Sequence, residues 1–85
     1  MEVIWGTEAK ANLAAIARSD PQTARRIAQR VKEFAQAGGG DVRKLHGTPE
    51  QWRLRIGDWR AVFVFTDSPR RMEVLRVADR RDAYR

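Results

Sequence analysis

Three arginines flank a predicted turn at Gly57-Asp58 and have the spacing to form one cationic surface. The segment WRLRIGDWRAVFVF reads as two strands joined by that pair, because glycine takes the positive φ that a two-residue hairpin turn requires. In such a hairpin Arg55 lies opposite Arg60, and alternation puts Arg53 on the same side. Like charges directly opposite each other destabilise a sheet by up to about 1 kcal/mol, so we expect an anion to bind there. The alternative is a solvated face of a basic protein, because runs of charge usually face water.

The other side of the same hairpin is apolar. Its predicted cross-strand pairs are Ile56–Trp59, Leu54–Ala61 and Trp52–Phe63. Alternation gives this side seven residues: Trp52, Leu54, Ile56, Trp59, Ala61, Phe63 and Phe65. The aromatic members could stack on nucleic-acid bases, but an apolar sheet face must be covered. We therefore expect them to form the core.

The chain has 85 residues and a formal net charge of +6. Fourteen of its 17 lysine and arginine residues are arginine, whose planar guanidinium suits bidentate contacts to phosphate. Charge alone leaves nucleic acid, an acidic protein and an anionic surface open as partners.

The composition also excludes several kinds of site. Cysteine is absent, which rules out disulfides and thiolate metal sites and is compatible with a reducing cytoplasm. Apolar runs such as 61–65 are far shorter than a membrane span, and MEVIWGTEAK lacks the pattern of a signal peptide. His, Asp and Glu show no metal-ligand spacing, so we expect neither a metal nor a cofactor. We predict a soluble cytoplasmic protein with a single domain over residues 1–85.

Hydrophobic period and breaker residues predict one strand, two helices and then three strands. The elements are expected at 2–5, 8–18, 21–37, 52–56, 59–65 and 72–78. Asp20 and Pro21 have the residue types of a helix start, and Gly38 suits the position after a helix end. Residues 41–51 read as a partly ordered basic loop, and 79–85 as a polar tail. The expected fold class is α+β: an N-terminal strand, a two-helix hairpin and a three-strand antiparallel meander, with the helices on one face of one twisted sheet.

Three motifs span much of the chain: KLHG at 44–47, WRLRIGDWRAVF at 52–63 and VLRVADRRDAYR at 74–85. Together with the helical hairpin, they resemble the RelE/ParE superfamily of bacterial and archaeal toxins, specifically its RelE-like branch. The resemblance implies a RelE-like fold and a toxin of a type II toxin–antitoxin pair. It also implies metal-independent cleavage of mRNA in the ribosomal A site and silencing by an antitoxin.

In that family, basic residues of the central strands surround the scissile phosphate, together with an arginine and a tyrosine near the C-terminus. By motif, the catalytic roles fall on Arg53, Arg55, Arg60, Arg81 and Tyr84. Arg80 takes the role of Arg81 if the C-terminal motif is aligned one residue earlier. The RNA-binding roles fall on Arg43, Lys44, Arg76 and Arg80. This chain departs from the family at two places. The best-known ribosome-dependent members have lysines where this chain has Arg53 and Arg55, and close sequence relatives often have histidine where this chain has Asp79.

The implied reaction is attack of a ribose 2′-hydroxyl on the adjacent phosphorus, which leaves a 2′,3′-cyclic phosphate and a 5′-hydroxyl. Arginine can stabilise the phosphorane charge, and one such preorganised donor contributes about 10²–10³ in rate. It is a poor general base because its pKa exceeds about 12. Tyr84 and His46 are the other candidates. We expect Tyr84 to orient the RNA, whereas His46 sits in a loop with no partner visible in the sequence.

Two other functions stay open. One is a ParE-like toxin that binds a protein target such as DNA gyrase without cleaving RNA, and the other is an attenuated RNA-binding homologue. The arginine face and the RRDAYR tail favour RNA cleavage. The expected partners are the ribosome with mRNA and an antitoxin from the adjacent gene, with an acidic or amphipathic helical segment. Arg25, Arg26 and Arg30 on the second helix are expected to face solvent or this antitoxin.

Overall fold

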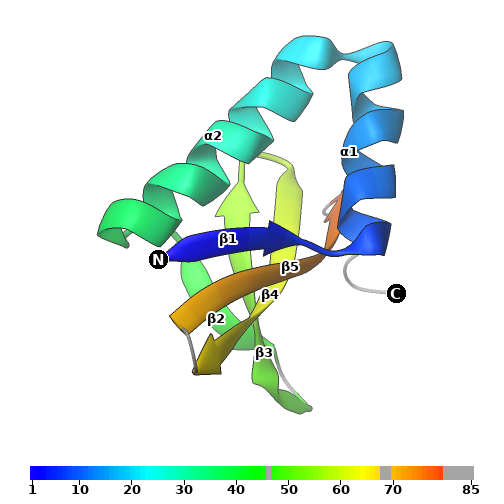
Figure 1. The fold of residues 1–85 in the computed structure, drawn as a ribbon. Coiled ribbons are helices and arrows are strands. Elements are labelled where there is room, and N and C mark those ends of the chain that lie inside the picture. Colours follow the sequence, from blue (N-terminus) through cyan, green and yellow to red (C-terminus); the bar gives the residue numbers. More distant parts are fainter. Residues whose placement is uncertain (46, 68–69, 80–85) are drawn as a thin grey trace.

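Two helices pack on one face of a five-stranded sheet in the computed structural model, which describes residues 1–45, 47–67 and 70–79 (Figure 1). The elements in chain order are β1 Glu2–Trp5, α1 Thr7–Ser19, α2 Pro21–Ala37, β2 Val42–Leu45, β3 Thr48–Ile56, β4 Trp59–Asp67 and β5 Arg70–Asp79. The predicted α+β class and helical hairpin are confirmed. Neither helix in this part of the chain is long and apolar enough to cross a membrane.

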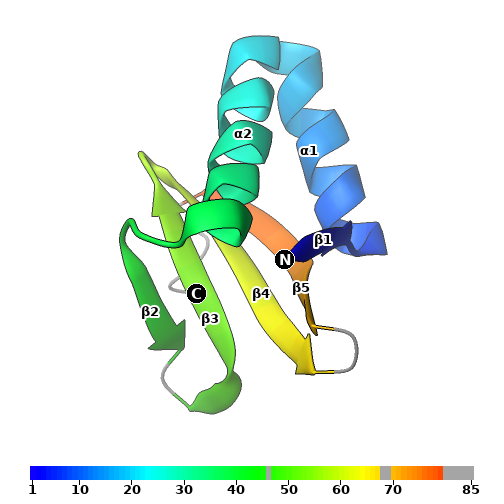
Figure 2. The same ribbon diagram turned by 60° about the vertical axis from the view of Figure 1, so that its left-hand side comes forward.

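The strands lie in the order β1-β5-β4-β3-β2. β1 runs parallel to β5, and every other neighbouring pair is antiparallel. From β1 at one edge, the chain passes through the two helices and re-enters the sheet at the opposite edge as β2 (Figure 2). The meander that follows therefore has one more strand than predicted.

The interpretation of residues 41–51 as a loop is wrong, because this segment holds β2 and the start of β3. β2 pairs with β3 through Val42 opposite Leu54 and Lys44 opposite Trp52. The Arg55 N–H donates to the carbonyl of Asp41 at 2.9 Å. A four-residue edge strand depends on its partner for stability, and VRKL is too short and too charged to show a strand pattern of its own.

The ends of α2 match the residue types that predicted them. Asp20 caps the start of the helix by accepting hydrogen bonds from the Thr23 N–H at 3.1 Å and from the Thr23 hydroxyl at 2.6 Å. The hydroxyl and then the N–H of Thr23 hold the pKa of Asp20 below its ordinary value. Pro21 is the first helical residue, and Gly38 ends the helix with a φ of 72°.

The core lies between the helices and the sheet (Figure 2). The helices contribute Ala9, Ile16, Ile27, Val31 and Ala35 to it. From the hairpin, Leu54, Ala61 and Phe63 are fully buried, and the two tryptophans pack against them. The ring centroid of Phe63 lies 5.3 Å from those of Phe34 and Phe65. The apolar side of the hairpin therefore packs as core, as predicted, and is not free to stack on bases.

Candidate nucleic-acid interface

The three central arginines lie together on the sheet face that points away from the helices. Arg55 is opposite Arg60 and Arg53 is opposite Val62, as the predicted register requires. Because the Arg55 N–H bonds to Asp41 on the β2 side, no backbone hydrogen bond joins Arg55 to Arg60. The Cα atoms of such a pair are only about 4.5 Å apart. The two side chains therefore start from the closest spacing that a sheet allows.

Arg43 of β2 adds a fourth cation to this face, because it lies opposite Arg53. Neighbouring strands are about 4.8 Å apart and two residues span about 6.8 Å, so the four side chains start within roughly 10 Å by 7 Å. We call Arg43, Arg53, Arg55 and Arg60 the arginine patch. The Arg43 Nε lies 3.5 Å from a carboxylate oxygen of Asp41, but its side chain is 71% exposed. An ion pair so open to water contributes about 0–1 kcal/mol and can yield to another anion.

The members of the arginine patch differ in exposure. Arg60 is only 4% exposed, Arg53 is half-buried, and Arg43 and Arg55 are exposed. Val62 lies on the same face, and although it is 2% exposed it is not part of the core under the helices. The centre of the patch is therefore enclosed. Arg60 does not fit the alternative interpretation, in which all these arginines extend into solvent. Charge interactions at such a position are screened less than in open water.

The hairpin turn connects the arginine patch with α2. Gly57 has a φ of 60° at the first central position of the turn, which is typical of a type II′ hairpin. Its carbonyl accepts a hydrogen bond from the Arg55 Nε at 3.3 Å. A β-carbon at Gly57 would collide with the guanidinium of Arg26. The sequence gives no signal for this Arg26 position, because the contact joins two elements that local patterns treat separately.

Of the other predicted RNA-binding residues, Lys44 lies away from the arginine patch and Arg76 lies on the same face of the sheet. Lys44 is opposite Trp52, which places it on the helix side of the sheet, and its ammonium lies 5.4 Å from the Trp52 ring centroid. This is a cation–π distance. Arg76 is opposite Val62 in the register, one strand beyond Arg60, and it also lines a cavity of about 490 Å³ together with Asn12 of α1.

Arg80, Arg81, Tyr84 and His46 lie outside the described residues. Since the chain has no cysteine and only one histidine and one tyrosine, the described part contains no thiol, imidazole or phenol. In this part, His, Asp and Glu side chains do not gather in any group of three or more that could hold a metal ion. The arginine patch can therefore bind a phosphate and stabilise its charge, while its arginines are poor groups for proton transfer.

Comparisons with known proteins agree with this fold. A family model described as "ParE toxin of type II toxin-antitoxin system, parDE" matches residues 3–84. The YoeB/ParE toxin from Agrobacterium tumefaciens is 21% identical with a TM-score of 0.77, over 93% of this chain and 98% of that chain. The matching chain of the chromosomal ParDE system of P. aeruginosa is 20% identical with a TM-score of 0.74, over 93% of this chain and 95% of that chain. The matching chain of the archaeal RelE-RelB complex from Pyrococcus horikoshii is 22% identical with a TM-score of 0.69, and the match covers 93% of each chain. Among curated protein sequences, none matches this chain significantly.

The solved structures share the fold with this chain at 20% to 22% identity, which carries the architecture and not the activity. The RelE/ParE superfamily expected from the motifs is confirmed, while its RelE-like branch stays a prediction. The family model covers almost the whole sequence, from the first strand to the C-terminal tyrosine. The chain therefore belongs to the ParE toxin family of type II toxin–antitoxin systems.

Proposed function

We propose that this toxin cleaves mRNA on the ribosome and that the arginine patch holds the scissile phosphate. The observation that carries the proposal is the direct opposition of Arg55 and Arg60, the second of which is 4% exposed. Two like charges placed directly opposite each other repel, and a phosphate between them would attract both. Guanidinium groups also suit this role because each can donate two parallel hydrogen bonds to phosphate oxygens.

The reaction balances without a cofactor. The ribose 2′-oxygen loses its proton and bonds to phosphorus, and the bond from phosphorus to the 5′-oxygen breaks as that oxygen gains a proton. Arg53, Arg55 and Arg60 stabilise the negative charge that grows on the non-bridging oxygens. We assign Arg81, with Arg80 as its register alternative, to the same phosphate and Tyr84 to orienting the RNA.

The proposed need for a ribosome follows from proton transfer. An arginine keeps its proton at neutral pH and is a poor base, so the arginine patch alone positions RNA better than it cleaves it. The ribosome would fix the RNA in a geometry ready for attack. Purified toxin should therefore cut naked RNA slowly.

A cognate antitoxin is the second proposed partner. The P. horikoshii RelE structure is a complex with RelB, and type II toxins are paired with antitoxins. For this chain, with a net charge of +6, we propose an antitoxin from the adjacent gene with an acidic or amphipathic helical segment. Charge complementarity would speed its association.

The ParE family match favours one other candidate function, in which the toxin binds a protein target such as DNA gyrase and leaves RNA intact. The arginine patch would then contact an acidic protein surface. This alternative predicts growth arrest without new RNA ends.

Induced expression followed by mapping of mRNA 5′ ends separates the two functions. The test compares the natural chain with Arg55→Ala and with Lys10→Ala, a matched charge change at an exposed position of α1. Cuts within codons of translated messages that disappear only in Arg55→Ala support RNA cleavage. Intact messages together with inhibited supercoiling by gyrase overturn it and select the second candidate.

A further inference from the structure

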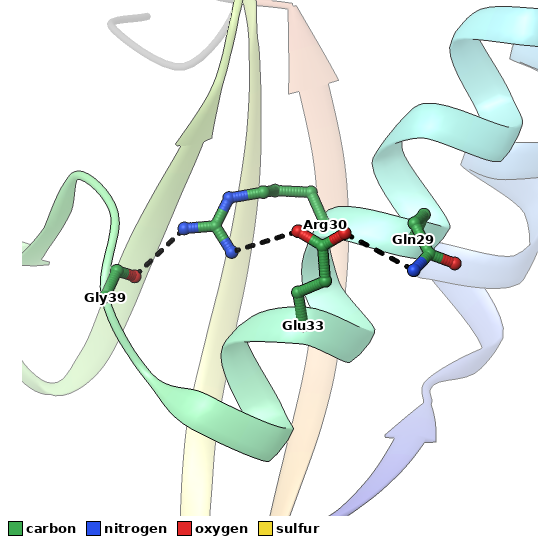
Figure 3. A network of polar contacts seen from close by, with 4 residues as sticks. All are labelled: Gln29, Arg30, Glu33 and Gly39. Carbon is green, nitrogen blue, oxygen red and sulfur yellow. Dashed lines mark hydrogen bonds and ion pairs between the residues drawn. The ribbon is translucent and has the colours of Figure 1, made fainter.

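Two arginines of α2 lie one helical turn apart and both reach glycine-containing turns. Arg30 has two partners there: its Nη2 donates to the carbonyl of Gly39 at 3.0 Å, and its Nη1 lies 3.9 Å from a carboxylate oxygen of Glu33 (Figure 3). The other oxygen of Glu33 accepts a hydrogen bond from the Gln29 amide at 3.3 Å. Arg30 therefore has a structural role in fixing the chain after α2.

Arg26 lies differently. It is exposed and its guanidinium rests against Gly57, but within the described part of the chain it forms no hydrogen bond or ion pair. Arg55 approaches the same glycine and donates to its carbonyl at 3.3 Å. Two guanidinium groups from separate elements thus meet at one turn. Asp58, the carboxylate of that turn, is exposed and pairs with neither of them among the described residues.

Beyond the turn, the positive charge continues along α2. A shallow depression of about 580 Å³ is lined by Arg25, Arg26, Ala28, Gln29 and Lys32. The acidic residue of α2 is Glu33, which pairs with Arg30 and so does not neutralise this surface. A cationic path therefore leads from the arginine patch across Gly57 to the outer side of α2.

We propose that Arg26 binds the RNA phosphate next to the one held by Arg55 and Arg60, so that the strand passes over the Gly57-Asp58 turn onto α2. This inference rests on the proposed RNA cleavage and adds a positioning residue from the helical layer. Glycine suits the crossing point because no side chain separates the RNA backbone from the guanidinium groups on either side. The Asp58 carboxylate opposes a phosphate there, so its removal should strengthen binding.

Binding of a short single-stranded RNA to the full chain, measured across a range of salt concentrations, tests this role. Arg26→Gln keeps most of the side-chain stem and removes the charge, Arg26→Lys keeps the charge, and Lys10→Ala controls for net charge. Each phosphate contact to single strands contributes about 0.7 to the logarithmic salt slope. Arg26→Gln should therefore lower the slope by about 0.7 and the affinity roughly fivefold at about 0.1 M salt. Arg26→Lys and Lys10→Ala should keep the natural slope, and Asp58→Asn should bind more tightly.

The outcomes distinguish the inference from the function on which it rests. If Arg26→Gln binds RNA like the natural chain while Arg55→Gln binds weakly, the Arg26 role is wrong and the arginine patch stands. If the natural chain shows no salt-dependent RNA binding, both are overturned. A lowered melting temperature with an unchanged salt slope would show that Arg26 only supports the turn. Loss of antitoxin binding with RNA binding intact would assign Arg26 to the protein partner.

Discussion

Arg60 and Arg55 share one face of the sheet but differ in burial, and this difference makes their alanine variants unequal. Alternation alone treats them alike and predicts that Arg60→Ala leaves stability within about 1 kcal/mol, because it relieves repulsion. The 4% exposure of Arg60 adds an opposite effect on the free energy of unfolding. Truncation to alanine removes the packed aliphatic part of the side chain and so lowers stability. Substitutions that disturb buried side chains destabilise by about 1–3 kcal/mol. We therefore expect a net loss of about 1–2 kcal/mol for Arg60→Ala and a change within about 0.5 kcal/mol for Arg55→Ala.

Thermal unfolding and ribosome-dependent cleavage, measured on the same variants, test this expectation. In a domain of this size, 1 kcal/mol shifts the melting temperature by roughly 4–8 °C, so the loss from Arg60→Ala is measurable. Arg60→Met keeps most of the stem without the charge and should recover much of the stability. Cleavage should fall by about 10²–10³ in all three variants, because each lacks one charge-stabilising donor.

The double variant measures the repulsion itself. Either single substitution removes the whole repulsion between Arg55 and Arg60, so the second substitution in the double variant gains nothing more from it. Arg55→Ala with Arg60→Ala should therefore be less stable than the two single effects predict, by up to about 1 kcal/mol. Equal melting temperatures for the two single variants would contradict the inequality argued from burial. Full cleavage by Arg60→Met would refute its contact with the phosphate.

Three further predictions concern the helix cap, the turn and the antitoxin. Asp20→Ala should lower the melting temperature at neutral pH, because the cap of α2 is lost. The pKa of Asp20 is lowered in the folded state, so its contribution is present above the unfolded pKa and lost as pH falls through the folded one; melting curves of the two proteins should converge in acid. Gly57→Ala should destabilise by about 1 kcal/mol or more, because the φ of 60° is strained for alanine; equal urea midpoints would contradict this. Antitoxin association, followed by stopped flow, should slow as salt rises, and a salt-independent rate would exclude electrostatic steering.

The central hairpin could be predicted residue by residue because two local signals agree on it. Alternation assigns each side chain to a face, and the glycine turn fixes which residues are opposite. One face holds Leu54 and Phe63 in the core, and the other holds the Arg55–Arg60 pair, as the observed register confirms. The grouping of the central arginines was predictable for the same reason.

What the sequence could not predict depends on neighbours from distant parts of the chain. β2 forms because β3 is available to pair with it, and this strand brings Arg43 to the arginine patch and turns Lys44 to the other side. Arg60 is buried on β4, which has β3 and β5 on either side, whereas the exposed Arg55 lies on β3 beyond the last residue pair with the short β2. Local alternation assigns a residue to a face of the sheet, but it does not predict how deeply the side chain is buried there.

The Gly57 turn links the core, the arginine patch and α2 in one geometric relation. A slip of β3 by one residue against β4 would move Leu54 to the outer face and put Arg53 and Arg55 into the core. Folding and phosphate binding therefore depend on the same turn. Substitution of the exposed Arg55 should leave the register intact, because it removes one charge and one exposed hydrogen bond to Gly57 but no core contact. The chemistry of the outer face can thus vary among proteins of this fold without loss of the core, which is why the arginine side chains, and not the shared architecture, must decide between an RNA and a protein target.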